Sequence, residues 1–390
     1  MDATPTRERL TEFFHSVYRA EPQIIARAPG RVEFIGNHTD YNGGLVVGAA
    51  IDRSLFVAVS PRTDGKLRFA SEFSAGVPER EQDTLEKFEG KQAWANYPLG
   101  VFAHLRRHGL DAGTGFNLAI ASDLPSGAGL SSSAALEMGV GSALTALYGI
   151  ALSKEEMVRL GRAVENDFLG VPTGPLDQTC SAFGKANKLV YIDCRTLDVE
   201  LLPFPEQCRI QIFNSGVRHS LVDSLYSKRH DECIEALRLL RLDHPDFEYL
   251  TDADEKHLET LPADTPADVV KRARHVIREN ERVRAAKSAL FSGDLDAVGR
   301  LLVESHHSSR TLFENSCPEL DTLVDLLARS PNVHGARLSG GGFGGTVIAL
   351  TSLAFGEDDA RTICDDYEKA HGNRPDTLAC TTAEGAEVLG

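Results

Sequence analysis

The stretch LPSGAGLSSSAAL at residues 124–136 places glycines and then three consecutive serines directly before an apolar helical run. Glycines let a backbone curl with its N–H groups inward, and the start of a helix adds unpaired donors and a positive dipole end. Serine hydroxyls there either cap the helix or bind a magnesium ion that is bridged to phosphate. The stretch is not a Walker loop, because no lysine follows its last glycine. It predicts an anion site, unless it is an ordinary capped helix after a flexible turn.

Around this stretch the hydrophobic periodicity predicts both helices and strands. In the first half we expect strands over 23–28, 44–50, 54–60, 66–71 and 115–121, with helices over 7–20, 96–108, 131–148 and 154–169. In the second half we expect strands over 209–214, 335–339, 345–350 and 377–382, with helices over 224–242, 267–292, 295–305 and 359–371 and one that starts after Cys317-Pro318. Strands occur both as neighbours and with helices between them, so an α+β layered fold is favoured. The proline-containing segment LLPFPEQ indicates a domain boundary near 200–208.

Composition narrows the class of protein. The chain has 390 residues and a formal net charge of −16, and no basic block offsets that charge, which argues against a nucleic-acid or membrane partner. The N-terminal segment has no apolar core of the kind a signal peptide needs, and no apolar run approaches the ~20 residues that span a bilayer. Seven cysteines with no CxxC pair indicate reduced thiols. We expect a cytoplasmic protein, a monomer, without a structural zinc site.

Two further loops and two acidic residues are candidates for ligand binding or catalysis. RLSGGGFGGT at 337–346 has more glycine than a hairpin needs, which indicates close approach to a ligand or to another loop. RAPGRVEFIGNHTDYNGGL at 27–45 gathers side chains that suit hydrogen bonding to several hydroxyls, unless it is a polar surface turn. Glu165 and Asp177 bracket a turn-rich segment, where a lone Asp is commonly a cap. Together, a phosphate loop, a polyol loop and two placed acids are typical of phosphoryl transfer to a hydroxyl.

The chain resembles the galactokinase family of the GHMP kinase superfamily over nearly its whole length. The resemblance depends on APGRVEFIGNHTDYNGG at 28–44, LPSGAGLSSSAAL at 124–136, GPLDQ at 174–178 and LSGGGFGGT at 338–346, supported by stretches at 192–197, 214–233 and 303–321. It implies an α+β, two-domain GHMP kinase fold with mixed sheets, layered helices and an active site in the inter-domain cleft. The N-terminal domain, residues 1–205, would carry the sugar and phosphate loops, and residues 206–390 would form the C-terminal domain.

The resemblance also implies an activity: ATP- and Mg²⁺-dependent phosphorylation of the anomeric hydroxyl of galactose. Asp177 matches the catalytic base of the family and Arg31 its partner. The implied sugar contacts are Asn37 by position, His38, Asp40, Gly174 and Tyr226. The implied nucleotide contacts are Trp94 and Tyr97 at the adenine and Gly127, Gly129, Ser131, Ser132 and Ser133 at the phosphates, with Ser132 or Ser133 and Glu165 as magnesium ligands. Gly340–Gly345 would help close the cleft.

One motif departs from the family pattern. The family usually has GRVN-(L/I)-IGEHTDY, in which the Glu holds the C6 hydroxyl of the sugar, whereas this chain has Asn37 there and Glu33 in place of the usual Asn. Loss of a carboxylate at position 37 removes an electrostatic barrier to a sugar with a C6 carboxylate. The substrate is therefore either galactose or, for an anomeric kinase of altered specificity, galacturonate, a deoxy sugar or a pentose.

Two further functions are less well supported by the motifs. A GHMP kinase for mevalonate-type or homoserine substrates shares the phosphate loop but is expected to lack HTDYNGG, which is present here. A non-catalytic sugar sensor is expected to lose the serine run or the base, yet the run from Ser131 and Asp177 are both intact.

Overall fold

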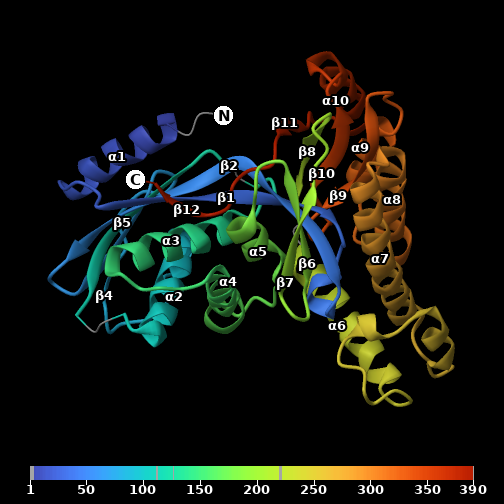
Figure 1. Ribbon diagram of the computed structural model, residues 1–390, viewed down its shortest axis with the longest axis horizontal. Helices are drawn as coiled ribbons and strands as arrows, with labels where there is room; N and C mark the ends of the chain where they lie inside the picture. The colour runs from blue at the N-terminus through green and yellow to red at the C-terminus, as the bar shows by residue number, and fades with distance from the viewer. Residues whose placement is uncertain (1–3, 111–112, 126, 219–221, 390) are drawn as a thin grey trace.

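Two sheets with helices packed on them organise the chain (Figure 1). The computed structural model describes residues 4–110, 113–125, 127–218 and 222–389. The first sheet has the strand order β12-β1-β2-β5-β3-β4, with β6 and β7 added alongside β2; the second has the order β11-β8-β10-β9. In the first sheet β3 and β5 run parallel and the other pairs are antiparallel, so that sheet is mixed. The predicted α+β class is confirmed.

The strands of the first sheet are β1 (Ile24–Ile35), β2 (Leu45–Arg62), β3 (Lys66–Ser71), β4 (Glu79–Glu81), β5 (Gly115–Ser122), β6 (Lys188–Asp193), β7 (Asp198–Pro203) and β12 (Glu387–Leu389). Those of the second sheet are β8 (Cys208–Arg218), β9 (Val333–Ser339), β10 (Gly344–Ser352) and β11 (Asp376–Cys380).

The α-helices are α1 (Thr4–Tyr18), α2 (Asn96–Leu105), α3 (Ser132–Tyr148), α4 (Lys154–Ala163), α5 (Leu176–Phe183), α6 (Val222–Leu240), α7 (Ala267–Ser292), α8 (Leu295–Ser308), α9 (Pro318–Leu327) and α10 (Glu357–His371). Short 3₁₀ segments are η1 (Asp40–Asn42), η2 (Gly90–Ala95), η3 (Arg106–His108), η5 (Leu250–Asp252) and η6 (Glu255–Thr260), and two π-turns are η4 (Val164–Leu169) and η7 (Ser309–Phe313). Among the described residues, none of these helices is long and apolar enough to cross a membrane.

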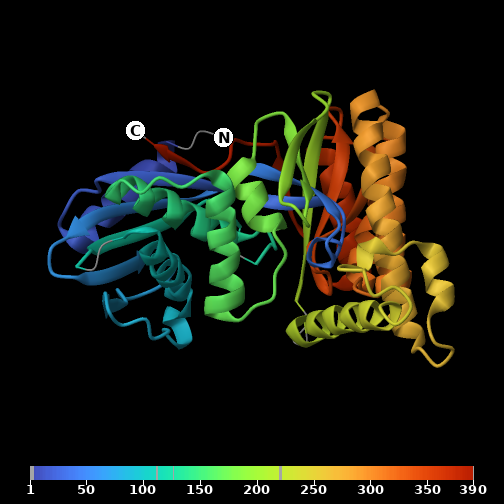
Figure 2. The same ribbon diagram turned by 60° about the horizontal axis from the view of Figure 1, so that its bottom comes forward.

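Helices cover both faces of each sheet (Figure 2). Because side chains alternate between the two faces along a strand, neighbouring residues of a strand pack against different helices. On the first sheet, Phe56 packs under α1, whereas its neighbours Leu55 and Val57 belong to the main core with α3. On the second, Phe213 packs against α9 and α10, and Ile212 packs with α7 and α8 in the main core. This main core therefore runs from the first sheet to the second and joins the two halves of the molecule.

The structure adds α5, β4, β6 and β7 to the expected elements, and it extends the strand expected over 23–28 to Ile35. Three further features differ from the expectations raised by the sequence. The strands expected over 44–50 and 54–60 are one strand, β2, because it pairs with β6 first and with β5 later while β1 lines its other edge. The helix expected over 154–169 ends at Ala163 and continues as the π-turn η4. The last strand, β12, returns to pair with β1, a crossing that no pattern in the sequence predicted.

A close contact between α8 and β9 gives a test of this packing. A Cβ added at Gly299 would lie 1.9 Å from the carbonyl oxygen of His334, so Gly299→Ala forces the helix and strand apart. We expect a loss of about 1–3 kcal/mol in the free energy of unfolding, measured by urea denaturation. Helix propensity alone predicts the opposite sign, a gain of about 1 kcal/mol. The control is Gly356→Ala, the N-cap of α10, where an added Cβ meets nothing and only a capping loss of up to about 1 kcal/mol is expected; a stabilised Gly299→Ala variant would contradict the contact.

Candidate active site

Two neighbouring cavities lie where the first sheet, α3, α5 and the β9–β10 loop meet. The first, of about 360 Å³, is lined by residues 124–125 and 127–133 and by the glycine loop 339–346. The second, of about 560 Å³, is lined by parts of the 31–40 and 170–177 segments and by Tyr226. Arg31 and Asp177 line both cavities. They therefore form the wall at which a molecule in one cavity meets a molecule in the other.

Arg31 and Asp177 form a bidentate ion pair. Arg31 lies on β1, and Asp177 lies in the first turn of α5. The guanidinium donates from Nε to Oδ1 and from Nη2 to Oδ2, each at 2.7 Å. Its third nitrogen, Nη1, donates to the carbonyl of Gly129 at 2.8 Å, which ties the pair to the phosphate loop. Both carboxylate oxygens are thus held in one orientation.

The loop before α3 has the curled backbone that an anion site needs. Gly127 and Gly129 have φ values of 71° and 64°, and Ser131 has 55°. The Ser131 hydroxyl does not cap the helix; it donates instead to Asp177 Oδ2. The first N–H groups of α3 thus have no side-chain cap from Ser131, and Ser132 and Ser133 line the cavity beside them. An ordinary capped helix does not describe this segment, and the geometry suits an anion.

The second glycine-rich loop lies against the first. Thr346 donates its hydroxyl to the carbonyl of Ala128 at 2.5 Å, and the carbonyl of Gly340 accepts from Asn37 at 2.8 Å. Gly340 and Gly341 line both cavities. A Cβ at Gly342 would lie 2.1 Å from the carbonyl of Asn315, so this position has no space for a side chain. The predicted close approach to another loop is confirmed.

Glu165 offers an oxygen ligand next to the serines. It is buried in η4, and its Oε2 accepts from the Thr173 hydroxyl at 2.6 Å and from Gln178 Nε2 at 3.0 Å. Burial raises the pKa of Glu165 above its ordinary value. Ser133 also contacts this carboxylate. Hydroxyl and carboxylate oxygens are the ligands that Mg²⁺ takes, usually one or two from protein with the rest from water and phosphate, so this donor set fits that ion.

A second buried acid, Glu137, was not predicted. It is fully buried on α3, accepts from Gln178 Nε2 at 3.0 Å, and its Oε1 has no hydrogen-bond partner among the described residues. Burial, followed by the charge of Glu165, raises its pKa well above the ordinary value. The one signal for it in the sequence is a lone acid within the apolar run AALEMGV.

The residues expected at the sugar all line the second cavity: Asn37, His38, Asp40, Gly174 and Tyr226. The His38 ring stacks on Phe313 with centroids 4.2 Å apart, and its Nδ1 lies 2.9 Å from the Tyr41 hydroxyl. Burial, followed by the charge of a protonated His275, lowers the pKa of His38 to about 3, so the ring is neutral near pH 7. Its Nε2 lies 3.2 Å from the Gly341 carbonyl and 3.1 Å from Asn315 Nδ2, so both nitrogens of the neutral ring have partners within the protein.

Asp40 and Gly174 lie in contact. A Cβ at position 174 would lie 1.9 Å from Asp40 Oδ2, so only glycine leaves that carboxyl in place. Burial raises the pKa of Asp40 to about 7, and the charges of Glu33 and Asp177 add to the shift. Asp40 therefore titrates within the working pH range of most enzymes.

This raised pKa gives a stability prediction with a definite sign. The folded state binds the Asp40 proton more tightly than the unfolded state, whose pKa is near 3.8, so this carboxyl destabilises the fold increasingly as pH rises from about 4 to about 7. Asp40→Asn removes that cost. We expect the free energy of unfolding of the variant at pH 8 to exceed that of the unsubstituted protein by on the order of 2 kcal/mol, a figure reduced because Asp40 is partly exposed and solvent screens its charge. Near pH 4 the two proteins are expected to be equally stable.

Urea denaturation at several pH values measures this difference. Asp321→Asn is the matched control, because the pKa of Asp321 is lowered by its hydrogen bonds with His306 and Ser316 despite its burial. That carboxylate stabilises the fold above pH 4, so the control is expected to lose stability at pH 8. A difference between Asp40→Asn and the unsubstituted protein that does not vary with pH would contradict the assignment.

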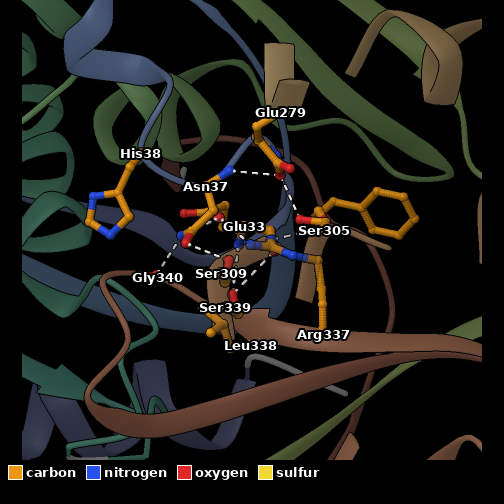
Figure 3. A network of polar contacts seen from close by, with 12 residues as sticks. Glu33, Asn37, His38, Glu279, Ser305, Ser309, Arg337, Leu338, Ser339 and Gly340 are labelled. Atoms are coloured by element: carbon orange, nitrogen blue, oxygen red, sulfur yellow. Dashed lines mark hydrogen bonds and ion pairs between the residues drawn. The ribbon is translucent and has the colours of Figure 1, made fainter. Parts of the chain in front are cut away.

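Asn37 lies in a dense network of polar contacts (Figure 3). Its Nδ2 donates to Glu33 Oε1 at 3.0 Å and to the Gly340 carbonyl, and its Oδ1 accepts from Ser309 at 3.1 Å and Asn315 at 2.9 Å. Glu279 on α7 fixes the backbone, because its Oε1 accepts from the Asn37 N–H at 3.1 Å. The α7–η7 region thus holds the loop that carries the candidate sugar ligands.

Glu33 is paired with a fully buried arginine. Arg337 Nη2 lies 2.9 Å from Glu33 Oε1, and Arg337 has no exposed surface. Burial raises the pKa of Glu33, while Arg337 and Arg31 limit that rise. Glu33 lines the second cavity next to Asn37. The cavity wall therefore retains a carboxyl group beside position 37, although the carboxylate usual at that position is missing.

Trp94 and Tyr97 are not among the residues that line the two cavities. Trp94 is in η2 and Tyr97 in α2, and neither lines the cavity beside the phosphate loop. The indole Nε1 of Trp94 is buried without a hydrogen-bond partner among the described residues. Burial, followed by the charges of Glu165 and Glu137, raises the pKa of Tyr97 to about 12. Their role at an adenine stays a prediction.

Comparison with known proteins agrees with this geometry. Residues 12–61 match the galactokinase galactose-binding signature, 96–185 the GHMP kinases N terminal domain, and 286–373 the GHMP kinases C terminal region. The chain is 40% identical over 378 residues to a galactokinase of Chloroflexus aurantiacus, an alignment that covers 96% of each protein. The crystal structure of Lactococcus lactis galactokinase complexed with galactose superposes with a TM-score of 0.93 at 34% identity, covering 98% of this chain and 100% of that one. Methanococcus jannaschii mevalonate kinase shares the fold, with a TM-score of 0.65, 18% identity and coverage of 94% and 100%.

Proposed function

This chain belongs to the galactokinase family of GHMP kinases, and we propose that its paired cavities transfer the γ-phosphoryl group of ATP to the anomeric hydroxyl of galactose. The observation that carries the proposal is the Arg31–Asp177 pair on the wall that the two cavities share. We call the first of them, beside residues 127–133, the phosphate-loop cavity, and the second, which holds the expected sugar contacts, the polyol cavity. The expected products are galactose 1-phosphate and ADP.

Asp177 is proposed as the general base. The anomeric hydroxyl is more acidic than other sugar hydroxyls, because the ring oxygen stabilises its anion. Asp177 would accept that proton as the bond from the sugar oxygen to the γ-phosphorus forms and the bond from the γ-phosphorus to the bridging oxygen breaks, so that ADP leaves. Arg31 fixes the direction of both carboxylate oxygens, and its remaining contact with the Gly129 carbonyl places its positive charge beside the phosphate loop. That charge stabilises the negative charge of the transferring phosphoryl group.

The phosphate side of the site is proposed to use α3 and the serines. The start of α3 would bind the phosphates through backbone N–H groups of the 127–133 loop. Ser132 or Ser133 and Glu165 would hold Mg²⁺, since their oxygens fit its preference. When bound, the ion neutralises phosphate charge. Ser131 differs from its neighbours, because its hydroxyl donates to Asp177 and so helps to orient the base.

The test is a coupled ADP-release assay with ATP, Mg²⁺ and a panel of galactose, galacturonate, N-acetylgalactosamine, fucose and arabinose. We expect galactose to have the highest kcat/KM, and ³¹P–¹³C coupling in the product to place the phosphate on C1. Preferred turnover of galacturonate or arabinose would replace galactose by that substrate class. Sugar binding without ADP release would indicate a sensor. Monomeric state, cytoplasmic location and the division into domains at 1–205 and 206–390 remain parts of the same proposal.

A further inference from the structure

The Asn37 amide has no hydrogen-bonding capacity left for a substrate. An amide side chain has two N–H donors and two acceptor positions on its oxygen. Nδ2 uses its donors on Glu33 Oε1 and the Gly340 carbonyl, and Oδ1 accepts from Ser309 and Asn315. Because the partners of Nδ2 are acceptors and those of Oδ1 are donors, the amide is fixed in this orientation. A sugar hydroxyl would have to displace one of these buried contacts.

Glu33 has the capacity that Asn37 lacks. Its Oε1 faces Asn37 and Arg337, and no described residue donates to its second oxygen, Oε2. Glu33 lines the polyol cavity. Its backbone is held by the Ser339 hydroxyl, which contacts both its N–H and its carbonyl at 3.0 and 3.2 Å. Two residues, Asn37 and Arg337, thus hold the side chain and Ser339 holds the backbone, while one carboxylate oxygen is still able to accept a hydrogen bond.

The strand places Glu33 close to the Arg31–Asp177 pair, in the same cavity. Arg31 and Glu33 are two residues apart on β1 in a regular stretch of its pairing with β2, so their side chains share one face and start about 7 Å apart. Arg31 holds Asp177, where the anomeric hydroxyl would lie. Glu33 is therefore placed toward the opposite end of a sugar ring in the same cavity.

We propose that Glu33, rather than Asn37, accepts a hydrogen bond from the C6 hydroxyl of the sugar, and that Asn37 and Arg337 are positioning residues for it. The inference rests on the proposed function and names the group that sets substrate class. Because the carboxylate has moved from position 37 to position 33 and not been lost, a C6 carboxylate would meet a like charge. The site is thus specific for a neutral hexose with a free C6 hydroxyl, and it rejects uronates and 6-deoxy sugars.

The test compares sugars that differ only at C6. Glu33→Gln and the unsubstituted protein are assayed with galactose, D-fucose (6-deoxygalactose) and galacturonate. Loss of a hydrogen bond to a charged acceptor is expected to lower the galactose-to-fucose ratio of kcat/KM by about 10- to 100-fold. The inhibition constant of galacturonate against galactose is expected to fall in the same variant, since the repelling charge is gone.

The matched control is Glu279→Gln, which makes the same chemical change in the same network. Glu279 contacts the backbone of Gly36 and Asn37 but does not line the cavity, so it is expected to change kcat/KM for galactose and fucose by a common factor and to leave their ratio unchanged. An unchanged ratio in Glu33→Gln, or an equal fall in both variants, overturns the proposal. If Glu33→Gln does not fold, the unsubstituted protein decides, because galacturonate binding as tight as galactose binding also overturns it. Absence of turnover with every sugar would instead refute the proposed function.

Discussion

Asp177→Asn is expected to lower kcat by about 10²- to 10⁴-fold, the usual contribution of a general base. The amide has nearly the shape of the carboxylate but cannot accept a proton from the anomeric hydroxyl. The neighbouring side chains that line the two cavities are unchanged, so binding of galactose and ATP is expected to persist. Single-turnover kinetics measure the chemical step, and isothermal titration calorimetry measures the two dissociation constants.

Asp321→Asn is the control for this prediction. Asp321 accepts from His306 at 3.1 Å and from Ser316 at 2.7 Å and lines neither cavity, so the same substitution there is expected to affect stability and to change kcat by no more than a few-fold. Undiminished turnover in Asp177→Asn would remove Asp177 from the mechanism. Loss of binding together with turnover would show that Asp177 supports the architecture of the site rather than the proton transfer.

Arg31→Lys is expected to lower kcat by about 10²- to 10³-fold, comparable to the loss of one preorganised donor from a charged transition state. A lysine keeps the charge but cannot make two parallel hydrogen bonds to one carboxylate and a third to the Gly129 carbonyl. Asp177 would lose its fixed direction, and the phosphate loop would lose its link to the base. Because the pair lies between the two cavities, we expect the fall in kcat with only modest changes in either dissociation constant.

Arg27→Lys provides the comparison on the same strand. Arg27 also lies on β1 and pairs with Glu387 at 2.8 Å, but it lines neither cavity. It is expected to have nearly unchanged kcat, measured in the same coupled assay. Equal losses in both variants would indicate a general effect on β1, and full activity of Arg31→Lys would show that charge alone is sufficient at position 31.

Much of the site was predictable from sequence because its parts are local. A glycine-serine loop before a helix binds anions by virtue of its backbone, so LPSGAGLSSSAAL indicated a phosphate site wherever the chain placed it. The period of hydrophobic residues likewise predicted most helices and strands, and α7 has the predicted bounds of 267–292. The pairing of Arg31 with Asp177, residues 146 positions apart, came from family resemblance and not from any local pattern.

Contacts between distant segments were decided by the tertiary structure alone. Compared with the family pattern, the sequence has Glu at position 33 in place of Asn and Asn at position 37 in place of Glu. Taken alone, this difference indicates that the carboxylate that binds the sugar is lost. The fold brings Arg337, Ser309 and Asn315 to these two residues from about 270 to 300 positions away, and those contacts saturate the amide and leave one oxygen of Glu33 able to accept. The pairing of β12 with β1 and the burial of Glu137 have the same origin. Hydrogen-bond partners and desolvation depend on which segments pack together, and no spacing along the chain encodes that.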